Sequence, residues 1–236
     1  MKKTLLFFLC LLIINCDNSY EKELNLIDLI PTNPILLVKY NSTRKTNTEV
    51  FNKNLNLLIN QKTNSISNRF FEDPVLISYH NIGKNNIESI FFSNEKNIRT
   101  NYKIEDSTKY DGYIIKKRTI KDINHFSSVK NGIYMESKSK LLIENTLRSS
   151  NHMSTEKSSD LKKLYGISDS NVTIFISEKF SQNLNDFNLS NIFNISEITD
   201  WMQYDIEINK NSLTLNGLGI LNDSIFKKIN LLKNII

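Results

Sequence analysis

The sequence of 236 residues predicts an α+β protein in which helices pack on one side of one or more antiparallel sheets. Strands are indicated where every second side chain is apolar, most clearly over residues 201–208. The dipeptide Asn131-Gly132 lies between two apolar runs, as is typical of a tight turn between antiparallel strands. Helices are indicated where apolar residues are spaced i, i+4, i+7, as at Phe51, Leu55 and Leu58.

The composition excludes several classes of protein. Hydrophobic residues make up 39% of the chain and charged residues 23%, which is enough for a packed core and excludes wholesale disorder. Two cysteines exclude a disulfide framework and a Cys-rich zinc module. Without Lys2 and Lys3, which belong to a leader, 28 basic side chains stand against 25 acidic ones, a net charge of +3. That balance is too even for a nucleic-acid-binding protein, so we expect no nucleic-acid partner.

The first 15 residues have the pattern of a signal peptide. Lys2 and Lys3 are followed by an apolar stretch over residues 5–14. Ten helical residues span about 15 Å, half of the roughly 30 Å hydrocarbon core, so this stretch is too short to cross a membrane. It has the length of a signal-peptide core, and Cys16 comes directly after Asn15 at its end. Cys10 lies within the apolar stretch and is expected to be an apolar filler.

This leader resembles the lipobox of bacterial lipoproteins. The resemblance implies that the Cys16 thiol carries a diacylglycerol, that the leader is cut before Cys16, and that the new amino group is acylated. Asn15 departs from the Gly, Ala or Ser that usually precedes the cysteine. The alternatives are a plain secretory leader and an uncleaved anchor. We therefore expect a signal peptide over 1–15, a lipidated tether over 16–23, and an outer-membrane lipoprotein of the cell envelope. The choice between the periplasmic face and the cell surface stays open.

Residues 24–148 are predicted to form a first α+β half. Pro31 ends a helical turn, and Ser137 or Ser139 is expected to cap the last helix of this half. The expected elements are, in order, a helical turn over 24–30, a strand over 35–40, a helix over 48–59, a hairpin over 75–80 and 87–92, a strand over 112–119, a hairpin over 126–129 and 133–136, and a helix ending near 148.

A Ser-rich linker over 149–159 is predicted to lead to a second α+β half over 160–236. Its expected elements are a short helix to 165, a strand over 172–177, a helical face at 180, 184 and 187, strands over 201–208 and 212–218, and a final helix from about 223. Both halves run strand, helix, strand, strand, which suggests an internal duplication. The halves share no clear residue-level identity, so a chance order is the alternative.

Several segments resemble a group of Bacteroidetes, flavobacterial-type, envelope lipoproteins with no assigned activity. The matching pieces are the leader, the run Leu-Ile-Pro-Thr-Asn-Pro at 29–34, the run Met-Glu-Ser-Lys-Ser-Lys-Leu-Leu-Ile-Glu at 135–144, and Trp-Met-Gln-Tyr-Asp at 201–205 followed by Asn-Ser-Leu-Thr-Leu-Asn-Gly at 211–217. Many members of that group are longer, so the resemblance identifies this chain as a short or truncated member. It implies an envelope location and no particular enzyme activity.

No catalytic or metal-binding motif stands out. The chain has no Gly-x-Ser-x-Gly, His-Glu-x-x-His or Cys-x-x-Cys motif and no Gly-rich phosphate loop. We therefore expect no enzyme activity, no catalytic residue, no metal and no cofactor. On the strand over 201–208, Trp201, Gln203 and Asp205 are expected to lie on the face opposite Met202, Tyr204 and Ile206. Two interpretations stay open: these side chains form an exposed binding surface, or Trp201 covers the edge of the sheet against a neighbouring helix.

Three function classes follow from this. The favoured class is a non-enzymatic binding or scaffolding module of the cell envelope. Its partners would be the membrane, through the lipid, and an envelope protein or a glycan. The second class is a surface lipoprotein that binds a glycan or peptide through Trp201. The third is a hydrolase with an unrecognised site.

Overall fold

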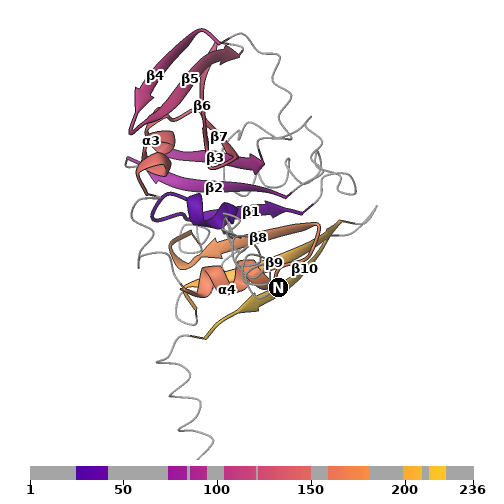
Figure 1. The fold of residues 1–236 in the computed structure, drawn as a ribbon. Helices are drawn as coiled ribbons and strands as arrows, with labels where there is room; N and C mark the ends of the chain where they lie inside the picture. The colour runs from indigo at the N-terminus through magenta and orange to yellow at the C-terminus, as the bar shows by residue number, and fades with distance from the viewer. Residues whose placement is uncertain are drawn as a thin grey trace, which may run out of the picture.

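A computed structural model describes residues 25–41, 74–83, 86–94, 104–120, 122–149, 159–180, 199–208 and 213–221. They form a ten-stranded sheet in which the neighbours run in the order β10-β9-β8-β1-β2-β3-β7-β6-β5-β4 (Figure 1). The strands are β1 (Leu36–Tyr40), β2 (Val75–Ile82), β3 (Asn86–Asn94), β4 (Asp106–Tyr110), β5 (Tyr113–Ile120), β6 (Ile123–Lys130), β7 (Ile133–Ser137), β8 (Val172–Ser177), β9 (Trp201–Ile208) and β10 (Leu213–Gly219).

Every neighbouring pair in the sheet is antiparallel. Three described helices accompany the sheet: the 3-10 helix η1 (Leu26–Leu29), α3 (Lys140–Ser149) and α4 (Ser159–Ile167). The predicted α+β class with an antiparallel sheet is therefore confirmed, and the sheet dominates the described part of the chain. The expected helices over 48–59 and from 223 lie outside the described residues, and so does the expected helical face at 180, 184 and 187 beyond Phe180.

One face of the sheet packs against the helices. Helix α3 contacts β3, β6 and β7, while α4 contacts β9. One continuous cluster contains side chains from η1, α3 and α4 together with strand side chains such as Leu37, Phe92 and Phe175. Burial of this apolar area supplies roughly 25 cal/mol per Å², so the helices are held mainly by packing on this face.

The opposite face carries a second apolar cluster across the middle of the sheet. Leu36, Val38 and Tyr40 of β1 contribute to it, and Ile206 of β9 is 5% exposed within it. Because successive side chains of a strand point to opposite faces, β1 and β8 are buried along their whole length on both sides. This explains why residues 35–40 and 172–177 are almost continuously apolar.

Left-handed backbone marks the tight turns. Asn131 and Gly132 have φ angles of 51° and 74°, which confirms the predicted turn between β6 and β7. Asp111 and Gly112 have φ angles of 48° and 82° and join β4 to β5 in the same way. The strand expected from Gly112 is present as β5, while β4 is not predicted because its residues show no apolar alternation.

The strands of the two expected halves belong to one sheet. Strand β1 pairs with β2 on one side and with β8 on the other, so the seam between residues 24–148 and 160–236 runs between β1 and β8. Most of the expected linker over 149–159 lies outside the described residues. An internal duplication stays a prediction.

Candidate functional site

A buried carboxylate joins three adjacent strands on the face of the sheet that points away from α3. Met135 of β7 packs with α3, so its neighbours Tyr134 and Glu136 point to the other face. The register places Ser127 of β6 opposite Glu136, and Arg118 of β5 opposite His125 of β6. Strand alternation therefore brings Arg118, His125, Tyr134 and Glu136 onto one face from three strands.

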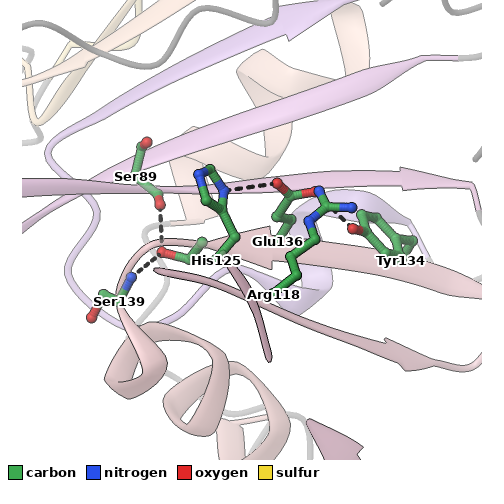
Figure 2. A network of polar contacts seen from close by, with 7 residues as sticks. Ser89, Arg118, His125, Tyr134, Glu136 and Ser139 are labelled. Carbon is green, nitrogen blue, oxygen red and sulfur yellow. Dashed lines mark hydrogen bonds and ion pairs between the residues drawn. The ribbon is translucent and has the colours of Figure 1, made fainter. Parts of the chain in front are cut away.

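Glu136 is the acceptor at the centre of this group, as Figure 2 shows. Its Oε2 accepts a hydrogen bond from Arg118 Nη2 at 2.6 Å and another from the Tyr134 hydroxyl at 2.7 Å. Its Oε1 lies 3.1 Å from His125 Nδ1. We call these four residues the Glu136 network.

The Glu136 network is largely removed from solvent. The side chains of Arg118 and Glu136 are 7% and 9% exposed, and that of His125 is 12% exposed. Burial raises the pKa of Tyr134 far above its usual range, and the negative charge of Glu136 raises it further. Tyr134 therefore stays a protonated donor, and the guanidinium of Arg118 offsets the buried carboxylate charge.

Serine hydrogen bonds tie the start of α3 to the sheet beside this network. Ser137 Oγ donates to the carbonyl oxygen of Ser89 at 2.7 Å and accepts from the Ser139 N–H at 3.0 Å (Figure 2). The Ser139 hydroxyl accepts from the Leu142 N–H at 3.4 Å, which confirms Ser139 as the expected cap.

Two buried lysines of the sheet bond to the ends of the helices. Lys130 Nζ donates to the carbonyl oxygen of Leu147 near the end of α3 at 2.6 Å. Lys39 Nζ donates to the carbonyl oxygen of Ser168 at 2.7 Å and to its hydroxyl at 2.8 Å, just beyond α4. A cation near a helix C-terminus is favourable because it satisfies terminal carbonyl groups and opposes the negative end of the helix dipole.

Burial lowers the pKa of Lys39, and the charges of Asp205 and Asp169 oppose that shift. Asp205 lies on the same row of the sheet as Lys39, with Thr173 between them. Its Oδ1 accepts from Thr173 Oγ1 at 2.8 Å and from Gln203 Nε2 at 3.1 Å. Asp205 therefore links Thr173 and Gln203 beneath α4, in the row of the sheet that also holds Lys39.

Trp201 packs against a helix, as one of the two interpretations expected, and Trp201, Gln203 and Asp205 do not form the exposed surface that the other required. Trp201 is 6% exposed and Gln203 is 3% exposed, while Asp205 is half-buried. The physical reason is that α4 packs over β9, so Trp201 joins Leu161 and Leu164 in the helix-covered cluster. The opposite row with Tyr204 and Ile206 is buried as predicted.

Cys16 lies outside the described residues. His80 is buried, and its Nε2 lies 2.7 Å from the hydroxyl of Ser78, which is 0% exposed. A buried serine of this kind cannot meet a substrate without opening of the core, so the pair belongs to the packing of the sheet. Within the described ranges, no group of three or more His, Cys, Asp or Glu side chains could hold a metal ion.

No motif in the sequence marks the Glu136 network. His125 belongs to no motif in the sequence, and Glu136 stands out there only as part of the run at 135–144. A usable signal was present: Glu136 sits in the short apolar strand 133–137, where a charge is costly unless it is paired. What the sequence does not reveal is the partner, because Arg118 lies on a strand that is not adjacent to β7 in the sheet.

Comparisons with known proteins found few similarities. No family model matches the chain, and no curated protein matches it. Two solved structures of TP0453 are similar at 13% sequence identity. Crystal form I has a TM-score of 0.45 and covers 91% of this chain and 87% of TP0453. Crystal form III has a TM-score of 0.36 and covers 90% and 88%. A likeness at this level defines no function. The resemblance to Bacteroidetes lipoproteins stays a prediction.

Proposed function

We propose that this protein is a membrane-anchored bacterial envelope lipoprotein whose body is a non-enzymatic binding or scaffolding module. The leader carries the proposal. Lys2 and Lys3, an apolar stretch of ten residues and Cys16 occur in the order that lipid modification of a cysteine requires.

The membrane would be the first partner of such a protein. Each buried CH₂ group of an acyl chain contributes about 0.8 kcal/mol to membrane binding, so one chain binds marginally and two or three chains bind stably. The acylated Cys16 would supply those chains. Within the described residues, no helix is long and apolar enough to cross a membrane.

The hydrogen bonding of the body supports a non-enzymatic role. Glu136 holds bonds from Arg118, Tyr134 and His125 within one sheet. Lys39 and Lys130 bond to carbonyl groups at the ends of α4 and α3. Reactive side chains in a catalytic site need access to a substrate. These groups instead hold strands and helices together, which favours a scaffold.

The glycan- or peptide-binding alternative loses the feature that motivated it. It required an exposed tryptophan as a stacking platform, and Trp201 is buried against α4. If the folded part of the protein binds a partner, it does so through a surface other than the one formed by Trp201.

Substitution of the two leader cysteines tests the proposal. In cells grown with labelled palmitate, Cys16→Ser is expected to abolish labelling and to release the protein from the membrane fraction. Cys10→Ser is the matched control, because it makes the same chemical change within the same leader, and it is expected to retain both label and membrane association. Cys16→Ser protein that stays labelled and membrane-bound would overturn the proposal.

A further inference from the structure

The two edges of the sheet differ in charge. Strands β10 and β4 are the outermost strands, at opposite ends of the sheet (Figure 1). Strand β4 carries Asp106 and Lys109, and Glu105 directly precedes it. Strand β10 has the sequence Leu-Thr-Leu-Asn-Gly-Leu-Gly, with no charge and no proline. Charges and prolines on an edge strand oppose pairing with another chain, so β4 has that protection and β10 lacks it.

Strand β10 is also accessible. Residues 214–218 are all exposed. Leu215 and Leu218 point to opposite faces of the sheet and are 38% and 45% exposed. Among the described residues, no strand pairs with the outer side of β10. A strand added at this edge would pair with the outer backbone groups of β10 and would cover both leucines.

Two glycines leave the backbone of this edge bare. Gly217 and Gly219 lie opposite Tyr204 and Met202 of β9. A Cβ on Gly217 would lie 2.9 Å from Tyr204 Cε1, so the tyrosine side chain fills the space that a side chain of β10 would take. Because glycine has no side chain, the backbone of β10 at Gly217 and Gly219 is open to a strand of a neighbouring molecule.

We propose that β10 pairs with β10 of a second copy of this chain, antiparallel and about a two-fold axis. Because β10 carries no charge, pairing β10 of one copy with β10 of another brings no like charges together, and this favours a second copy as the partner. All pairs in the sheet are antiparallel, and a two-fold axis at β10 continues that pattern into the partner.

This inference rests on the proposed function, because the membrane anchor is what makes the pairing of two β10 strands strong enough to form. One strand pair buries less than the roughly 1,200 Å² of a standard stable interface, so the pairing is weak between freely diffusing molecules. Anchoring on one membrane raises the effective concentration and favours the pair without new contacts.

Disulfide cross-linking in native membranes tests the pairing. Single cysteines replace Thr214, Asn216 and Leu218 in the full chain that also carries Cys10→Ser. In an antiparallel pair, directly opposite Cα atoms lie about 4.5–5.5 Å apart, which a disulfide can bridge. Thr108→Cys on the exposed β4 edge is the matched control. The membranes are oxidised with copper phenanthroline, and the products are separated by mass.

The expected result is a disulfide dimer that is several-fold more abundant for the best β10 position than for Thr108→Cys. Adding Leu215→Lys to that variant is expected to reduce the dimer to the control amount. Equal cross-linking at β10 and β4, or a β10 product with the mass of a different protein, overturns the proposal. The same oxidation of concentrated Cys16→Ser protein separates the two ideas: a β10 dimer there supports the pairing even if the lipid anchor fails.

Discussion

Replacing Glu136 by alanine removes the acceptor that holds the Glu136 network together. The side chain of Arg118 is 7% exposed, so its guanidinium would stay buried without the carboxylate at 2.6 Å. The Tyr134 hydroxyl would lose its acceptor at 2.7 Å. Removing one partner of a buried ion pair costs about 3–5 kcal/mol, and an unsatisfied buried hydroxyl costs about 1–3 kcal/mol.

Both costs come from the loss of the same carboxylate, so they are not additive. We expect Glu136→Ala to lower the free energy of unfolding by about 3–5 kcal/mol. That is a large part of the roughly 5–15 kcal/mol available to an ordinary domain. Because β7 joins β3 to β6, the loss is expected to affect the whole sheet and not one edge.

Urea unfolding followed by circular dichroism measures this loss. Glu144→Ala is the control with the same substitution, because Glu144 pairs with Lys140 at 3.4 Å on the exposed side of α3. We expect the control to change the free energy of unfolding by no more than about 0.5 kcal/mol. A loss for Glu136→Ala below about 1 kcal/mol, or no larger than that of Glu144→Ala, would refute the reasoning.

Two further predictions concern pH and glycine. Burial raises the pKa of four described tyrosines in the folded protein. Above about pH 10 these phenols ionise in the unfolded chain but stay protonated in the folded one, so the free energy of unfolding falls as pH rises. They are Tyr40, Tyr134, Tyr165 and Tyr204. The chain has nine tyrosines, so the part of the tyrosinate absorbance at 295 nm that corresponds to these four is expected to appear only with unfolding. Ionisation of all nine in the still-folded protein would contradict this. Gly217→Ala is expected to lower the melting temperature because its Cβ meets Tyr204 at 2.9 Å. A Cβ on Gly166 in α4 would meet no atom within 4 Å. Gly166→Ala is therefore expected to leave the free energy of unfolding unchanged or to raise it by up to about 1 kcal/mol. Equal melting temperatures for the two variants would refute the packing of Tyr204 on β10.

Local chemistry made part of the fold predictable. The Asn131-Gly132 turn, the cap by Ser139 and the buried row of β9 all depend on residues close together in the sequence. Pairing of distant strands has no such local signal. Strand β1 pairs with β8 across more than 130 residues, and only the folded chain shows that both expected halves share one sheet.

The sequence leaves the exposure of Trp201 open for a specific physical reason. Alternation identified the more apolar side of β9, but it carries no information on whether the other side is covered. Helix α4 covers it, and Gln203 becomes buried with Asp205 as a hydrogen-bond partner. The alternation of polar and apolar residues therefore identified which side chains share a face, while the exposure of that face depended on packing from elsewhere in the chain.

The most direct test of the lipoprotein proposal is the intact mass of the protein isolated from its native membrane, together with its N-terminal peptide. We expect a chain that begins at Cys16, with a diacylglyceryl group on the sulfur and an acyl group on the amino terminus. A chain that retains Met1, or one that begins at Cys16 with a free thiol, would contradict it.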